Sequence, residues 1–531
     1  MPWKKHPSIF EHVKAHIKPG TTGLDEAGRE LPDEERLAGP GEIRWSAGAM
    51  DGVLTHHWGG ADAESKKDAE AILAQIVEYC EKPTAEKQLK LYETVREKKA
   101  VVLVDPILKG LVANEKMDQQ RLYDLARFFA TESSDREPVK LGIAMLGIYR
   151  AAADKELFRT LGRHDEFTLY CVVAMANALE KPEPEIWELA KQVDGWGRVF
   201  AVEKLADTKD AQIKEWLLRE GYKNSVMYEY IAYTCAQTGG LLNALNRDQV
   251  DDPLLHSAGE LIQALLAGGP ALDINNYDDG TSAIECFLRH MDTRASGLSD
   301  FLTISAIKAF VSDKEADRKH RVQLGWTPEK RKECTTHCTM LLERPHWRQL
   351  TLECLDSNDE AVFHSASQVA EVLHIDPWKW HWKRLQQAPR KSTRWFYVMK
   401  HCNEPRIDEV VVFAEKALPL HEIATGPAKE SGLGNQFELH NCLGSVLQEL
   451  NRFPGHGYSL IATGLKSPVV RNRNMALEAL SAWGEAKWPD GTKEQLKSAL
   501  EKEPDEKVRK RIEEVIAGKP REKKPVGDDD K

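Results

Sequence analysis

The residues best suited to binding chemistry form a segment in which tryptophan is interleaved with lysine, arginine and histidine, from Asp376 to His401. Without histidine, this basic-aromatic segment holds seven cations against one anion, a local charge of +6 in a chain whose net charge is −11. Such residues stack on nucleobases and neutralise phosphates, or they anchor a protein interface. A third interpretation buries two tryptophans in a core and leaves the cations in solvent. The candidate binding residues are Trp378, Trp380, Lys383, Arg384, Arg394 and Trp395.

A second group of candidate binding residues lies in a glycine-rich stretch, Gly20 to Gly60, which has no sustained helical period. Long irregular segments are functional or disordered, and the large aromatic residues here argue against disorder. We expect this arm to pack over the first helices and cap the exposed end of a helical array. The alternative is a loop that contacts a ligand or partner. Its candidate residues are Arg44, Trp45, Asp51, His56, His57 and Trp58.

Potential metal ligands occur at three places. Glu343–His346 and Glu371–His374 have the Glu-x-x-His spacing that puts two di-iron ligands on one helix face, but bridging glutamates from other helices cannot be identified. Cys334, His337 and Cys338 share another face. Zinc sites usually present tighter Cys-x-x-Cys knuckles, and buried thiols explain these cysteines more simply. We therefore predict no metal site and no cofactor.

Motifs for nucleophilic catalysis and nucleotide binding are absent from the sequence. It contains no Gly-x-Ser-x-Gly, no Gly-x-x-x-x-Gly-Lys-Ser/Thr and no His-Glu-x-x-His. Gly432-Leu433-Gly434 lacks the third glycine of a dinucleotide-binding loop, because Phe437 stands there. We therefore predict no catalytic residue.

Composition indicates a folded, soluble protein. Of 531 residues, 41% are hydrophobic and 30% are charged, and the net charge of −11 disfavours nucleic acid as the default partner of the whole surface. The nine cysteines have no regular spacing, which is typical of reduced thiols in a cytosol. No apolar h-region of a signal peptide follows the opening residues, and the most apolar stretches are too short to span a bilayer. We expect a cytoplasmic protein with no membrane partner.

Two amphipathic helices near the end show the unit from which the chain is built. Ala476, Leu480 and Trp483 share one face of the first helix, and Val508, Ile512, Val515 and Ile516 share one face of the second. Neither helix can bury its apolar stripe alone, so each needs a neighbour. Helical periods with short connections continue back to Ala63. The sequence therefore predicts an all-α fold, an α-solenoid of antiparallel helix pairs with an irregular N-terminal arm.

Two resemblances refine this prediction. Residues 468–480 and Asp505-Glu506-Lys507-Val508-Arg509 resemble HEAT-type repeats, whose second helices favour an Asp-x-x-Val-Arg pattern. Residues 265–275, followed by 278–284, resemble an ankyrin junction, in which a helix end, a short β-turn finger and a helix start follow one another. Ser282 and Ile284 replace the usual Pro and His of that motif. Both resemblances imply an architecture and carry no activity.

These patterns divide the chain into five segments. They are a helix and glycine-rich capping arm (1–62), helical repeats (63–248), an ankyrin-like segment (249–345), HEAT-like repeats (346–518) and a charged tail (519–531).

The opening residues, Met1 to His12, resemble those of bacterial proteins labelled limonene hydroxylase. That resemblance implies an oxygenase with an oxygen-activating cofactor. A haem-thiolate enzyme would need a Phe-x-x-Gly-x-x-x-Cys-x-Gly loop, and Cys442-Leu443-Gly444 supplies only its end. We therefore expect a non-catalytic scaffold that binds another macromolecule, most readily a protein. The alternatives are the oxygenase and a binder of nucleic acid or another polyanion through the basic-aromatic segment.

Overall fold

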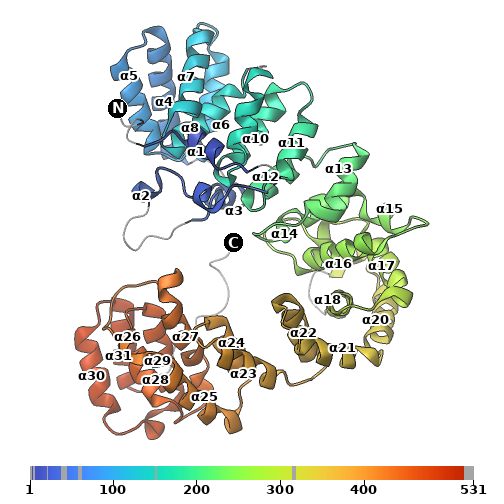
Figure 1. Ribbon diagram of the computed structural model, residues 1–531, viewed down its shortest axis with the longest axis vertical. Coiled ribbons are helices and arrows are strands. Elements are labelled where there is room, and N and C mark those ends of the chain that lie inside the picture. The colour runs from blue at the N-terminus through green and yellow to red at the C-terminus, as the bar shows by residue number, and fades with distance from the viewer. Residues whose placement is uncertain are drawn as a thin grey trace. The chain divides into compact units, whose positions relative to one another are not determined.

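The computed structural model describes residues 3, 6–18, 20, 22–37, 45–57, 62–149, 152–313 and 318–519. Within these residues the fold is all-α, with helices α1 to α31, short 3-10 turns and no β-strand beyond one isolated bridge (Figure 1). Helices pack in neighbouring pairs, so the predicted all-α, solenoid-like fold is confirmed. No helix of the described chain is long and apolar enough to cross a membrane.

Residue contacts divide the chain into two compact units, Met1–Trp347 and Arg348–Lys531, which we call unit 1 and unit 2. Helix α21 (His346–Leu355) begins in the first and continues into the second. The finer segments expected from the sequence stay predictions.

In unit 1, alternate helices pack on one another in series, from α8 through α10, α12, α14, α16 and α18 to α20. The intervening helices pack along this row, as α11 does on α10 and α12. The helices are α4 (Ala63–Glu81), α5 (Ala85–Arg96), α6 (Ala100–Ala113), α7 (Gln119–Glu132), α8 (Arg136–Leu146), α9 (Lys155–Leu161), α10 (Asp165–Ala178), α11 (Pro182–Ala190), α12 (Trp196–Glu203), α13 (Ala211–Trp216), α14 (Glu229–Gly239), α15 (Leu241–Leu245), α16 (Asp252–Ala267), α17 (Gly280–Arg294), α18 (Leu298–Ser312), α19 (Arg318–Gln323) and α20 (Pro328–Leu342).

Helix α7 shows why these segments are helical. Its buried residues follow the helical period, and the carboxylate of Asp118 caps its first turn by accepting the N–H of Arg121. The stripe consists of Leu122, Leu125, Ala126, Phe129 and Ala130. It packs against α8, which is buried over nearly its whole length.

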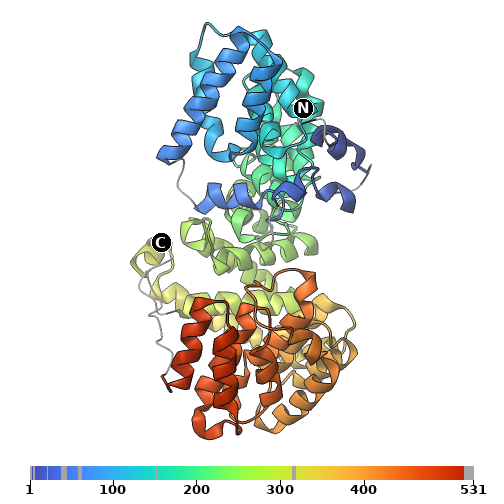
Figure 2. The same ribbon diagram turned by 90° about the vertical axis from the view of Figure 1, so that its left-hand side faces the viewer.

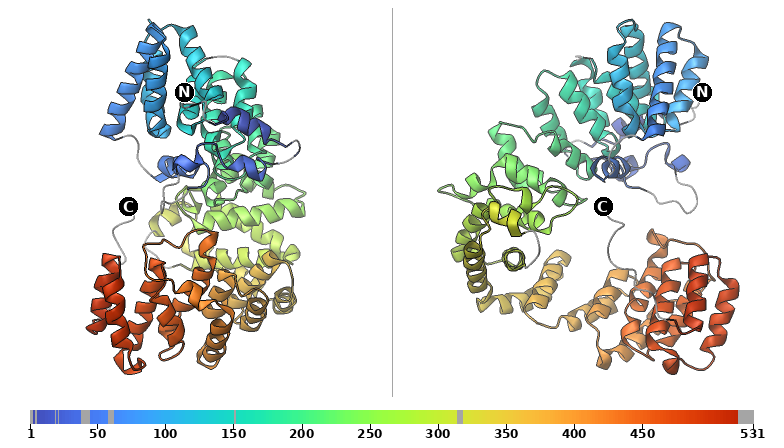
Figure 3. Two further views of the ribbon diagram at one scale, coloured as in Figure 1. Left: turned by 60° about the vertical axis from the view of Figure 1, so that its left-hand side comes forward. Right: turned by 180° about the vertical axis from the view of Figure 1, so that it is seen from behind.

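In unit 2, α24, α27, α29 and α31 form a second row of packed helices (Figure 3). The helix pair predicted near the C-terminus is confirmed, since Ala476, Leu480, Val508 and Ile512 are all buried. The helices of this unit are α22 (Glu360–Val372), α23 (Trp378–Gln387), α24 (Ser392–Lys400), α25 (Glu404–Ala417), α26 (Leu420–Ile423), α27 (Glu438–Leu447), α28 (Tyr458–Gly464), α29 (Val470–Trp483), α30 (Thr492–Lys502) and α31 (Glu506–Ile516).

The arm contributes α1 (Ile9–Ala15), α2 (Glu34–Leu37) and α3 (Ala49–His57) to unit 1 (Figure 2). Helix α1 packs on α7 and α9, while histidines of α3 reach Glu203 at the end of α12 and Tyr230 in α14. The arm thus contacts helices from α5 to α14, because Arg36 also reaches Glu97 next to α5 and α3 packs on α6. The capping role expected for the arm stays a prediction.

Candidate functional site

Helix α3 approaches the helical row closely because glycine stands at two positions. Gly48 has φ of +72°, a left-handed conformation that side chains rarely adopt. A Cβ on Gly52 would lie only 2.3 Å from the Trp196 ring, so any larger residue would push α3 off α12. The tryptophan ring and the glycine-bearing face of α3 therefore fix where the arm docks.

A buried ionic cluster secures the same part of the arm. The Nζ of Lys140, on α8, lies 2.9 Å from the Asp51 carboxylate of the arm and 2.7 Å from Glu166 on α10. Glu137 lies 3.6 Å from the same nitrogen, and Tyr170 donates a hydrogen bond of 3.0 Å to Asp51. Lys140 is only 1% exposed. The arm thus supplies one of three carboxylates around a cation that has no access to water.

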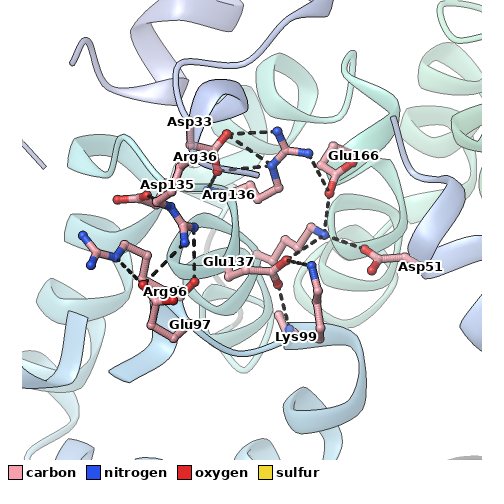
Figure 4. A network of polar contacts seen from close by, with 12 residues as sticks. Asp33, Arg36, Asp51, Arg96, Glu97, Lys99, Asp135, Arg136, Glu137 and Glu166 are labelled. Atoms are coloured by element: carbon pink, nitrogen blue, oxygen red, sulfur yellow. Dashed lines mark hydrogen bonds and ion pairs between the residues drawn. The ribbon is translucent and has the colours of Figure 1, made fainter. Parts of the chain in front are cut away.

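A second set of ion pairs continues this network along the arm (Figure 4). Arg136 pairs with Asp33 at 3.0 Å and with Glu34 at 2.6 Å, both in the arm. Arg36 of the arm pairs at 3.1 Å with Asp135, which precedes α8. Charge pairs from both α3 and α2 therefore hold the arm against α8.

The space between the arm and the helix starts is a pocket of about 900 Å³, which we call the arm pocket. Its walls come from three stretches of the arm and from the residues that begin α8, α10, α12 and the segment before α14. Trp45, 46% exposed, lines the pocket from the arm side, and Trp196 lines it from α12. The charged lining residues are Arg29, Glu30, Glu34, Arg136, Arg163, Asp165 and Asp194. The volume of the pocket lies within the range of about 300–1,000 Å³ that is usual for ligand sites.

Two neighbouring residues of the pocket, His164 and Asp165, have strongly shifted pKa values. Burial lowers the pKa of His164 to about 4, so the ring is neutral at neutral pH. It bridges the arm carbonyl of Arg29, at 3.2 Å from Nε2, and the N–H of Glu166, at 3.2 Å from Nδ1. Burial, and then the charge of Asp194, raise the pKa of Asp165 to about 7, although the backbone N–H groups of Gly195 and Gly197 oppose this shift.

The Asp165 shift predicts an unusual dependence of stability on pH. Because the folded-state pKa of about 7 lies above the ordinary value of 3.8, the folded state retains a proton that the unfolded state has lost. Stability therefore falls as pH rises from 4 to 7, by up to about 4 kcal/mol. The variant Asp165→Asn should lose this contribution and be more stable than the wild type at pH 8.

Thermal unfolding from pH 4 to 8.5 measures this effect as the difference in midpoint between wild type and Asp165→Asn. That difference should be small at pH 4 and largest above pH 7, while an exposed control, Asp248→Asn, should show no such trend. His164 acts oppositely, because its lowered pKa makes the fold lose stability as pH falls from 6.5 to 4. The contribution of His164 is present in both proteins, so it cancels in the difference between their unfolding midpoints. A flat curve for Asp165→Asn would contradict the prediction.

The sequence-predicted residues of the arm have different placements. Arg44 and Trp58 lie outside the described residues. Trp45 lines the arm pocket, whereas Asp51 is buried in the ionic cluster and holds the arm in place. His56 lies 2.8 Å from Glu203, and His57 lies 3.0 Å from the Tyr230 hydroxyl. Among these described residues, only Trp45 faces the pocket.

The tryptophans of the basic-aromatic segment are buried in unit 2. Trp378 stacks on Trp382 with ring centroids 5.3 Å apart, and both rings belong to its hydrophobic core. Trp380, 9% exposed, donates its indole N–H to Asp356 at 2.9 Å. Trp395 is 0% exposed and donates to the Pro389 carbonyl at 2.7 Å.

Acidic residues of α22 neutralise several cations of this segment. Glu360 pairs with Arg384 at 2.7 Å and with Arg394 at 2.5 Å. Glu371 pairs with Lys400 at 2.7 Å. The local charge of +6 was calculated from the segment alone. In the folded chain, the carboxylates of Glu360 and Glu371 lie beside these cations and offset part of that charge. Lys383 is the exposed residue among the six candidates of this segment.

Potential metal ligands have other partners. His337 lies 2.6 Å from Asp292, and Glu371 is engaged by Lys400 and His401. Cys334 and Cys338 are buried on α20. Across the described chain, no group of three or more histidine, cysteine or acidic side chains is placed to hold a metal ion.

Sequence reasoning missed Arg163, Asp165 and Asp194, which line the arm pocket. One signal was present, since Asp135, Asp165, Asp194 and Asn224 recur at intervals of 29 or 30 residues. The first three stand at or just before the starts of α8, α10 and α12. A repeat search over that interval would have grouped these helix starts on one edge of the row.

Comparison of the chain with protein-family models and with curated proteins found no match. The resemblances to HEAT repeats, ankyrin repeats and limonene hydroxylase therefore stay predictions, and a functional proposal must rest on the geometry of the site.

Proposed function

We propose that this protein is a non-catalytic helical scaffold that binds a segment of a partner protein in the arm pocket of unit 1. The observation that carries the proposal is the pocket itself, which has a volume of about 900 Å³ and is lined by the half-exposed indole of Trp45. Tryptophan anchors in pockets commonly supply much of the binding free energy at protein interfaces. Helical repeats present such surfaces without any catalytic group.

The charges of the molecule support a protein partner more than a nucleic acid. The net charge of −11 repels polyanions, and carboxylates of α22 engage Arg384, Arg394 and Lys400. Binding of a polyanion at the basic-aromatic segment remains a lesser proposal, as does a contact of the partner with Lys383. The HEAT-like class of the repeats and a cytoplasmic location also belong to this proposal.

Site-specific photo-crosslinking tests where a partner binds. A benzophenone amino acid would replace Ser46 in the arm pocket, which leaves Trp45 in place, Lys383 in unit 2, or Val112, a 66% exposed residue of α6 that serves as the control. Each full-length variant would be irradiated in host-cell extract, and crosslinked peptides would be identified by mass spectrometry. We expect one protein to crosslink at position 46 at least about tenfold more than at position 112, as burial against a bound segment requires.

The outcomes separate the alternatives. Loss of the position 46 crosslink in Arg163→Glu, with the fold intact by circular dichroism, would support binding inside the pocket. Crosslinks at position 383 and none at position 46 would overturn the pocket and place the partner on unit 2. Background crosslinking at all three positions would overturn the scaffold function.

A further inference from the structure

The arm pocket is lined by an arginine, Arg163, one of whose guanidinium nitrogens has no hydrogen-bond partner among the described residues. Arg163 lies between α9 and α10, where its backbone N–H donates to the Thr160 carbonyl at 3.3 Å. Its side-chain Nη1 is buried and has no hydrogen-bond partner among the described residues. Leaving a buried charged donor unsatisfied destabilises a fold. Because Arg163 also lines the arm pocket, a ligand anion there would meet its positive charge.

Among the described residues, no carboxylate forms an ion pair with Arg163. Burial lowers the pKa of Arg163, and no neighbouring acid raises it again. Arg136 in the same pocket differs, because Asp33, Glu34 and Glu166 surround it. Arg163 is thus a pocket cation to which the fold has assigned no anion, and guanidinium groups bind carboxylate and phosphate in a two-point geometry.

Another part of the pocket restricts which anion fits. Asp165 and Asp194 both line it, and Asp194 is an exposed residue. Asp165 packs against the start of α12, where a Cβ on Gly195 or Gly197 would lie 2.4 or 2.5 Å from its oxygens, and its pKa of about 7 leaves it partly protonated at neutral pH. A dianionic phosphate in this pocket would therefore be repelled mainly by Asp194, and more strongly than a carboxylate with its single negative charge.

We propose that the arm pocket recognises one carboxylate of the partner segment, an aspartate, a glutamate or a chain terminus, through the guanidinium of Arg163. This inference rests on the proposed function and names the chemistry that the bound segment must carry. Trp45 supplies an aromatic surface for the apolar stem or neighbours of the acidic residue. Asp194 excludes phosphorylated segments by charge repulsion.

An array of capped octapeptides tests the proposal with defined probes. Each peptide has random flanking residues and a fixed central glutamate, glutamine, phosphoserine or lysine, and the full-length chain is the soluble binder. We expect central glutamate to be retained at least about tenfold more than central glutamine, and phosphoserine and lysine to be retained least. Arg163→Gln should remove the preference for glutamate. Arg159→Gln, at an arginine of α9 outside the pocket lining, should preserve it.

Two further variants keep the test independent of folding defects. Arg163→Lys retains the positive charge but not the two-point geometry, so it should bind glutamate peptides with intermediate strength. Asp194→Asn changes only an exposed residue and should raise retention of phosphoserine peptides by removing repulsion. An unchanged phosphoserine signal in Asp194→Asn, together with an unchanged glutamate preference in Arg163→Gln, would overturn the proposed recognition.

The inference and the proposed function fail in different ways. Equal retention of glutamate and glutamine peptides would overturn carboxylate recognition and leave peptide binding standing. If no peptide is retained but sodium acetate protects Arg163 from phenylglyoxal, the pocket binds a free carboxylate and the partner-segment function is overturned. Absence of both peptide retention and protection would overturn both.

Discussion

Replacing Lys140 with methionine is expected to destabilise unit 1 by at least about 3–5 kcal/mol, as removal of one partner from a buried ion network does. The side chain is 1% exposed, and its Nζ lies within 2.9 Å of Asp51 and Glu166. Three carboxylates surround it, and their charges keep the pKa of Lys140 well above its ordinary value despite the opposing effect of burial. Methionine would leave these acids without their central cation.

Hydrogen exchange measured by mass spectrometry resolves this effect by region. Peptides from α8, α10 and the arm should exchange faster in Lys140→Met, while peptides from unit 2 report on the rest of the chain. Lys155→Met is the matched control, because Lys155 is 37% exposed and lies 3.4 Å from Glu185 in a surface pair of small value. Similar exchange in the two variants would contradict a stabilising role for the cluster.

A double variant tests whether charge balance is the cause. Asp51→Asn removes one of the three acids, so its effect and that of Lys140→Met should not add. The double variant should be less destabilised than the sum of the two single variants, by about 1 kcal/mol or more. Additive effects would show that lost packing, and not lost charge pairing, explains the change.

Replacing Arg473 with methionine is expected to destabilise unit 2 by a similar amount, about 3–5 kcal/mol. Arg473 of α29 is 1% exposed and Glu503, just before α31, is 2% exposed. Two hydrogen bonds of 2.7 Å join their side chains, and Arg473 also donates to the carbonyls of Ser467 and Pro468 at 2.8 and 2.9 Å. Methionine would leave a buried carboxylate and two carbonyls without their hydrogen-bond donor.

Hydrogen exchange of peptides from α29 and α31 measures this loss, with unit 1 as the internal reference. Arg473→Lys should fall between wild type and methionine, because an ammonium cannot reproduce the paired geometry of a guanidinium. Lys493→Met is the surface control, since Lys493 is 39% exposed and pairs with Glu485, which is 65% exposed. An Arg473→Met variant no less protected than this control would refute the prediction.

The sequence by itself determined the helices and their pairing. Stripes such as Val508, Ile512 and Val515 repeat every three or four residues, so the local pattern is enough to tell which face must be covered. Asp118 and Asp505, placed at helix starts, cap their own first turns, which are equally local contacts. The all-α fold with paired helices follows from such short-range rules.

Only the tertiary structure decided which charged residues were available for function. Glu360 neutralises Arg394 across 34 residues, and Asp51 reaches Lys140 across 89 residues, so neither pairing leaves a periodic signal in the sequence. The tryptophans expected to anchor a partner in unit 2 are instead enclosed by neighbouring helices. In unit 1, the buried Nη1 of Arg163 has no hydrogen-bond partner among the described residues. The helical period predicts which face of a helix is buried. The ion-pair partners of a charged residue depend instead on which helices become neighbours, and this is decided only when the chain folds.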